Sequence, residues 1–319
     1  MTELREFRRV DLPGLASLWN AVFTGGPGFV TVTEDDLARR VVDQLSFDPR
    51  NLLVACHSER PLGFVHFGPR TSLWSELRDR RPDPSEGHIY ALAAPESDRP
   101  LLSSLLQSAV ARLSEGGASR VLLGPSWIYG SQPFYNGIAG SYEIPGLSPR
   151  REALVGEAAA QGFSPLAHYG TPTLDLTDQG RLALLRDQLR LLRERARRWG
   201  LQERSLSLKT SFFFDRRAVA LVSGGETVAM TAYGVWHEHF RETGRILYGI
   251  TSVQVAEGWR GRGLGKLVML LAMEAALKDG AHGLHLHVYR DNRIAWNLYH
   301  RALGFAAGPE WFTLEKHVS

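Results

Sequence analysis

The chain has 319 residues, of which 44% are hydrophobic and 22% charged, a globular composition long enough for about two folded domains. Its 37 basic and 34 acidic residues leave a formal net charge of +3, which is too even a balance to indicate a nucleic-acid partner. A single cysteine, Cys56, excludes an internal disulfide and suits a reducing compartment.

No part of the sequence has the pattern of a membrane or export signal. The opening segment MTELREFRRV is charged and lacks the apolar stretch of a signal peptide. No apolar run approaches the roughly 18 residues that a membrane span needs. We therefore expect a cytoplasmic protein that binds neither membrane nor nucleic acid.

The predicted elements form a pattern that occurs twice. Residues 53–68 read as an apolar strand, a polar turn and a second strand ending in glycine, and residues 219–234 repeat this pattern without a gap. A helix, a glycine stop and a strand then occupy 105–123 and again 268–286. Each half is therefore predicted to be a mixed α/β unit with a crossover between neighbouring strands. Chance similarity of two α/β units is the alternative.

A turn-rich segment separates the two halves. Residues 171–180 carry Pro, Thr, Asp and Gly, and a strongly amphipathic helix pattern follows up to Gly200. The boundary is placed near residue 176, which gives domains of 1–176 and 177–319. Five arginines between Arg190 and Arg198 could form a basic patch, but leucines at helical spacing on the other face favour a solvated charged surface.

The segment WRGRGLGK, residues 259–266, places three glycines at alternate positions among two arginines and a lysine. Such a turn between a strand and a helix offers backbone N–H groups to a phosphate, because glycine lets a ligand approach the main chain. The dinucleotide fingerprint fails because Lys266 stands at its sixth position, and the Walker A motif fails because Leu267 replaces its Ser or Thr. A phosphate-bearing cofactor of another class is predicted.

The loop resembles the pyrophosphate loop of the GNAT family of acyl-CoA-dependent N-acyltransferases. The loop form Arg/Gln-x-x-Gly-x-Gly/Ala is matched at Arg260, Gly263 and Gly265. Residues 250–259 resemble the fourth strand of the family, which splays from the fifth, and residues 288–305 resemble its Asn-x-x-Ala-x-x-Leu-Tyr motif. The residues in register with that motif are Asn292, Ala295, Leu298 and Tyr299.

The resemblance implies an α/β fold of two tandem GNAT-like domains, each a mixed, mostly antiparallel twisted sheet flanked by helices. Tandem GNAT proteins include mycothiol synthase. Acetyl-CoA is the implied co-substrate, and no metal is expected. The implied cofactor-binding residues are Val253, Gln254, Val255, Arg260, Gly261, Arg262, Gly263, Leu264, Gly265, Lys266, Asn292 and Tyr299.

The first half lacks the features of this loop. The aligned segment, residues 93–102, has no glycine and carries Glu96 and Asp98 where a phosphate would lie. Pro100 also removes a backbone donor. Domain 1–176 is therefore expected to be a degenerate GNAT-like domain that does not bind CoA, and domain 177–319 the active one.

The resemblance also implies the chemistry, which is direct attack of an amine on the thioester in a ternary complex. A backbone N–H around Val253 to Val255 would stabilise the oxyanion, and Tyr299 would be the acid for the departing thiolate. Packing beside the pantetheine is the alternative role for Tyr299. Four residues, His300 to Leu303, separate Tyr299 from Gly304, one more than the family pattern has.

An alkyl amine has a pKa of roughly 10, so a base is needed. Residues 246–255 contain no carboxylate, and the candidates are therefore His237, Glu238 and His239, of which Glu238 is taken as the catalytic residue. A solvated strand end is the alternative. His285 and His287 share one strand face, but no third ligand has metal-like spacing, so we interpret them as polar strand residues near the cofactor.

The acceptor pocket is sought in residues 126–146, an aromatic-rich segment that lengthens the first half. Tyr135, Asn136 and Glu143 are the substrate-binding candidates, and the segment is expected to wall the acceptor side of the second half. Packing over the groove of the degenerate half is the alternative.

The predicted function is transfer of an acetyl group from acetyl-CoA to a primary amine of a small molecule or a peptide. We expect a monomer or a homodimer. The alternative is a CoA-binding sensor or partner-binding module without catalysis.

Overall fold

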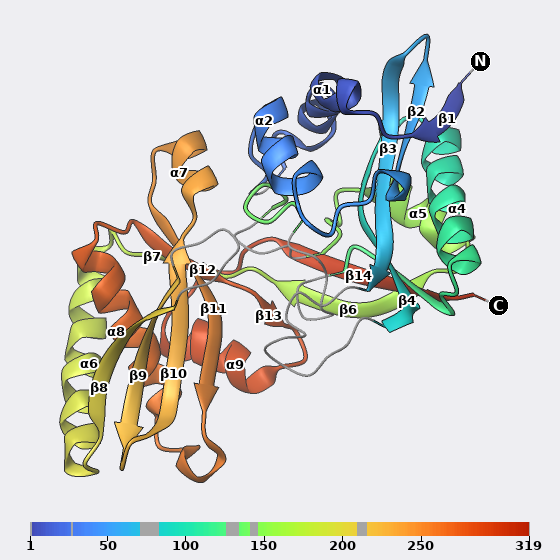
Figure 1. Cartoon of the computed structure of the whole chain (residues 1–319). Coiled ribbons are helices and arrows are strands. Elements are labelled where there is room, and N and C mark those ends of the chain that lie inside the picture. Colours follow the sequence, from blue (N-terminus) through green and yellow to red (C-terminus); the bar gives the residue numbers. More distant parts are fainter. Residues whose placement is uncertain are drawn as a thin grey trace. The chain divides into compact units, whose positions relative to one another are not determined.

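The computed structural model describes residues 2–26, 28–70, 83–125, 134–140, 146–208 and 216–318 (Figure 1). The chain forms two compact units, and the first consists of Met1–Tyr169 together with Glu310–Ser319. The second unit is Gly170–Pro309. None of the helices in the described part of the chain combines the length and the apolar character of a membrane span.

The first unit is a sheet with helices on both faces. Its strands follow the order β1-β2-β3-β4-β5-β14-β6, in which β4 and β5 pair in parallel and β14 pairs antiparallel with β5. Its elements are β1 (Glu3–Glu6), η1 (Arg9–Asp11), α1 (Leu12–Phe23), α2 (Glu34–Leu37), η2 (Ala38–Val42), η3 (Pro49–Asn51), β2 (Leu52–His57), β3 (Arg60–Arg70), β4 (Asp83–Ala93), α4 (Arg99–Glu115), β5 (Arg120–Leu123), α5 (Glu152–Ala160), β6 (Ser164–Gly170) and β14 (Glu310–His317).

The second unit repeats this plan. Its strands follow the order β7-β12-β11-β10-β9-β8, with β11 and β12 in parallel; α8 packs on the sheet, and α6 packs on α8. Its elements are β7 (Thr173–Asp175), α6 (Gln179–Arg198), β8 (Gln202–Leu208), β9 (Arg216–Ser223), β10 (Glu226–Val235), α7 (His237–Thr243), β11 (Leu247–Val255), η5 (Glu257–Trp259), α8 (Leu264–Lys278), β12 (Gly283–Leu286), β13 (Val288–Tyr289), α9 (Arg293–Asn297) and η6 (Leu298–Ala302).

The predicted repeat is confirmed element by element. The two hairpins are β2–β3 and β9–β10, and the two helix-strand pairs are α4–β5 and α8–β12. The amphipathic helix before Gly200 is α6, which buries Leu182, Leu185 and Leu189 on one face. The predicted α/β class with mixed, mostly antiparallel sheets is confirmed as well.

The two units exchange strands near their ends. The last strand of the chain, β14, lies between β5 and β6 in the first unit, and β7 pairs with β12 in the second. The chain therefore passes between the units at residues 169–170 and again at 309–310, whereas the sequence pattern places one boundary near residue 176. A strand can pair with any compatible free edge, so its place in the chain does not determine its sheet.

Candidate active site

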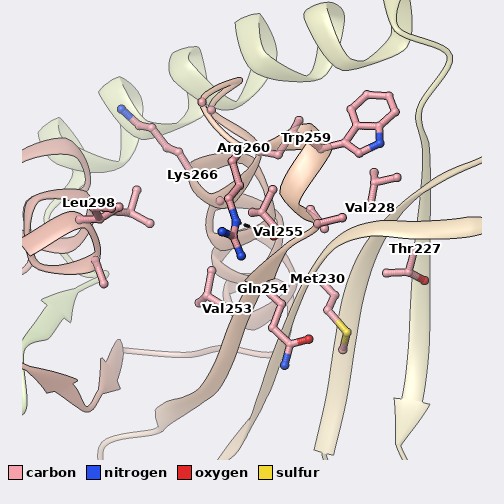
Figure 2. A pocket seen from close by; sticks show the side chains of 18 of the residues that line it. Thr227, Val228, Met230, Val253, Gln254, Val255, Trp259, Arg260, Lys266 and Leu298 are labelled. Carbon is pink, nitrogen blue, oxygen red and sulfur yellow. Dashed lines mark hydrogen bonds between the residues drawn. The ribbon is translucent and has the colours of Figure 1, made fainter. Parts of the chain in front are cut away.

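A groove of about 1190 Å³ lies within the second unit. It is lined by the ends of β10 and β11, the loop after β11, the first turn of α8, and α9 with η6 (Figure 2). Of the predicted cofactor residues, Arg262 is the one outside this lining. The others all line it: Val253, Gln254, Val255, Arg260, Gly261, Gly263, Leu264, Gly265, Lys266, Asn292 and Tyr299.

The groove forms because β11 and β12 stop pairing partway along β11. Their parallel pairing ends at Ile250 and Leu286, where β12 also ends, but β11 continues to Val255. The other edge of β11, which pairs with β10, has a bulge at this point. Tyr233 of β10 pairs with Ile250, but the adjacent residue Ala232 pairs with Ser252, so β11 has one extra residue between them. The bulged strand bends away from β12 and leaves one edge of β11 open to the groove.

The open edge presents two backbone N–H groups. The N–H of Ala256 donates to the carbonyl of Val228 on β10 at 2.9 Å, so this residue faces β10. Successive residues of a strand point their backbone groups to opposite edges. Val253 and Val255 therefore direct their N–H groups toward the groove, where they can donate to an amide or a thioester oxygen.

The glycine loop ends at the first turn of α8. Gly261 and Gly263 have φ values of 77° and 78°, in the left-handed region, and Gly263 is the N-cap of α8. Gly263 has no side chain that could cap the helix, so the N–H groups of the first turn can bind an anion. The helix dipole also favours an anion at this end. Figure 2 shows the side chain of Arg260 beside Val255, to whose carbonyl its Nε donates at 3.3 Å.

Tyr299 lines the groove and is 7% exposed. It belongs to a π-helical turn, η6, in which the N–H of Leu303 donates to the carbonyl of Leu298 at 3.0 Å. A π turn holds one residue more than an α turn, so it accommodates the extra residue before Gly304. Burial raises the pKa of Tyr299 to about 12, and the phenol is therefore protonated at neutral pH.

Glu238 lies elsewhere in the second unit. It is buried on α7, which Figure 1 places at the end of β10 and β11 opposite the glycine loop. Helix α7 follows Val235, the last residue of β10, and Val235 pairs with Tyr248 on β11. Val253 lies five residues further along β11 than Tyr248, a distance of about 16 Å at roughly 3.3 Å per residue. Glu238 is not part of the groove lining. Its role as the base stays a prediction.

A cluster of histidines adjoins the point where the strands part. His285 is buried on β12 and stacks on Trp236, with ring centroids 4.7 Å apart and an interplanar angle of 14°. His287 lies 5.9 Å from His285 between ring centroids. Burial lowers the pKa of His285 and of His239. Among the described residues, no group of three His, Cys, Asp or Glu side chains could hold a metal ion.

The acceptor candidates of residues 126–146 fall in the first unit. Tyr135 is buried, stacks on Trp19 at 5.1 Å between centroids, and its hydroxyl lies 3.1 Å from Nδ1 of His66. Asn136 is half-buried beside it, whereas Glu143 lies outside the described residues. Tyr135 thus has a packing role within its own unit, and the predicted role toward an amine stays a prediction.

In the first unit, side chains occupy the position that corresponds to the open edge of β11 in the second unit. The last parallel pair, Ile89 and Leu123, matches Ile250 and Leu286, so Leu92 is the counterpart of Val253. The guanidinium of Arg151 donates to the carbonyl of Leu92 at 2.9 Å and pairs with Glu96. The helix that follows, α4, is capped by a carboxylate, because Asp98 accepts from the N–H of Leu101 at 3.1 Å.

Comparisons with known proteins find one family model that matches part of the chain and solved structures with the same fold. Residues 186–305 match the model of the acetyltransferase (GNAT) family. A tandem GNAT protein from the clavulanic acid biosynthesis pathway, solved without AcCoA, shares 16% identity over 99% of this chain and 98% of its own, with a TM-score of 0.66. A GCN5-related N-acetyltransferase from Sphaerobacter thermophilus shares 13% identity over 99% and 95%, with a TM-score of 0.60. No curated protein matches the sequence.

Proposed function

We propose that the second unit transfers the acetyl group of acetyl-CoA to a primary amine, because residues 186–305 match the acetyltransferase (GNAT) family model and the chain has the fold of a tandem GNAT protein. One observation carries the proposal. A single groove joins an anion-binding helix start to an open strand edge and to a buried tyrosine. These are the contacts that a pyrophosphate, a pantetheine amide chain and a thioester need, in that order along one ligand.

Each part of the groove has a role in this proposal. The first turn of α8 and the side chains of Arg260 and Lys266 bind the pyrophosphate by charge and by N–H donors. The N–H groups of Val253 and Val255 hold the pantetheine amide and the thioester oxygen, where negative charge develops during attack. The buried hydroxyl of Tyr299 donates to the departing sulfur; its raised pKa favours hydrogen-bond donation over ionisation.

The first unit is proposed to have no cofactor role. Arg151 is 5% exposed and occupies the strand edge that would hold the pantetheine. Glu96 lies beside it and also accepts from the N–H of Ala153 at 2.8 Å. A pyrophosphate would have to displace a partly buried ion pair and approach two carboxylates, those of Glu96 and Asp98.

The test is release of free CoA from acetyl-CoA in the presence of a panel of small and peptide amines. We expect amine-dependent CoA release that Gly263→Glu abolishes, because the new carboxylate lies at the helix start where the pyrophosphate binds. Gly156→Glu is the matched control, because Gly156 is exposed on α5 of the first unit and a Cβ there meets open space among the described residues. CoA binding without turnover on any amine would favour the sensor function over catalysis.

A further inference from the structure

We propose that His287 receives the proton of the attacking amine, an inference that rests on the proposed acetyl transfer. His287 is the first residue after Leu286, the last residue of β12 to pair with β11. It therefore stands at the fork where β11 and β12 separate, although it is not one of the residues that line the groove. Val253, the first N–H donor of the open edge, lies three residues beyond the last paired residue, Ile250.

The direction of the side chain follows from the strand alternation. Leu284, Leu286 and Val288 all belong to the core that packs against α8. Alternate residues of a strand point to opposite faces, so His285 and His287 point to the other face of the sheet. An amine that approaches from that face meets His287 at the fork, on the side of the sheet away from α8.

The neighbouring histidine does not suit the same task. His285 is 4% exposed, lies flat against Trp236, and stays neutral because burial lowers its pKa well below the usual value. His287 is half-buried, and its ring is inclined by 69° to that of His285. Trp236 and His285 thus form a buried stacked pair, and His287 is the more exposed imidazole beside it.

The protons balance with groups of this chain and solvent. The alkyl ammonium first gives one proton to His287, directly or through one water, and His287 passes it to solvent. The neutral amine nitrogen then bonds to the thioester carbon, and the carbon–sulfur bond breaks while the hydroxyl of Tyr299 stabilises the departing thiolate. The excess proton on the new amide nitrogen passes through solvent to the thiolate, which ends as the thiol of CoA, and no oxidant or reductant is consumed.

The test compares nucleophiles that differ in their need for a base. His287→Gln should lower kcat/KM for an alkyl amine on the order of 100-fold, the usual effect of a lost proton acceptor. The loss should be much smaller with hydroxylamine, which is largely unprotonated at neutral pH. CoA affinity, measured by calorimetry, should change less than twofold, which also checks that the variant is folded.

Two further variants make the test decisive. His317→Gln removes an exposed histidine of β14 in the first unit and should leave all rates unchanged. Glu238→Gln should cause no selective loss with the alkyl amine; if it, and not His287→Gln, causes that selective loss, the base is Glu238 and the proposal is wrong. An equal loss for every nucleophile in His287→Gln would also overturn it. A wild-type protein that binds CoA but acetylates no amine would overturn the proposed function and this inference together.

Discussion

At the scale of single residues, the site depends on side chains whose burial sets their protonation. Tyr299 is held in its protonated form, and His285 in its neutral form, because each charged form would lie in an apolar setting. Neither property can be read from the sequence. The motif identifies Tyr299, but its pKa depends on packing against Phe305 and the core of the second unit.

Tyr299→Phe should lower kcat on the order of 100-fold and leave CoA affinity within a few fold, because the ring still packs and only the proposed donor to sulfur is lost. Steady-state kinetics with calorimetry on the same preparation separates the two quantities. A kcat equal to that of the wild type would assign the stabilisation of the sulfur to another group.

His66 makes the stability of the first unit depend on pH. Burial lowers its pKa to about 3, whereas the unfolded chain has a histidine pKa of about 6.5. The unfolded state therefore binds a proton that the folded state excludes, and the free energy of unfolding falls as pH drops below about 6.5. One such group contributes up to about 1.4 kcal/mol per pH unit.

Urea unfolding at pH 7.5 and at pH 5 checks this dependence. The wild-type protein should be less stable at pH 5, and His66→Gln should reduce the difference between the two values. Burial lowers the pKa of His88 too, so part of the dependence should persist in that variant. An unchanged difference would show that His66 titrates normally in the folded protein.

At the scale of elements, the loop before α8 requires glycine at particular positions. Gly263 has a φ of 78°, and an alanine there costs about 1–2 kcal/mol in the left-handed region. A loop that relaxes out of this conformation turns its N–H groups away from the proposed phosphate position. We expect Gly263→Ala to weaken CoA binding about tenfold.

Gly258→Ala is the matched control, because Gly258 has no positive φ and a Cβ there meets open space among the described residues. In CoA titrations, the Kd of Gly263→Ala should be about tenfold higher than that of Gly258→Ala. Equal affinities would mean that the loop conformation does not determine the phosphate contacts.

Most elements were predictable from pattern, and the exceptions have physical reasons. The hairpins and α6 follow from the periodicity of their apolar residues, which decides the buried face whatever the rest of the chain does. The extra residue before Gly304 was visible as a spacing, but its accommodation as a π turn depends on a hydrogen bond from Leu303 to Leu298. The position of His287 at the fork depends on the register of β11 with β12, which spacing alone does not give.

At the scale of the whole molecule, the last strand of the chain, β14, is part of the fold of the first unit. Trp311 on β14 is fully buried there, packs against Phe29 at 5.9 Å between centroids, and lies against Gly140, where a Cβ would clash with its ring. Nothing in the sequence of residues 310–317 indicates whether this strand joins the sheet of the first unit or that of the second. This is why the sequence pattern assigns the segment to the second domain.

Trp311→Ala should therefore destabilise the first unit by about 3–5 kcal/mol, although residue 311 follows the whole second unit in the chain. CoA affinity of the folded protein should stay unchanged, because no lining residue of the groove comes from β14. Chemical unfolding and CoA titration measure the two effects. Phe240→Ala, at a position that is 47% exposed, is the control and should change stability by less than about 0.5 kcal/mol.

We propose that one groove, in the second unit, binds the acyl-CoA. Calorimetric titration of the intact chain with CoA tests this most directly. We expect one CoA per chain and no detectable binding by Gly263→Glu, because Arg151 occupies the corresponding strand edge in the first unit. Two equivalent sites per chain, or full binding by Gly263→Glu, would contradict it.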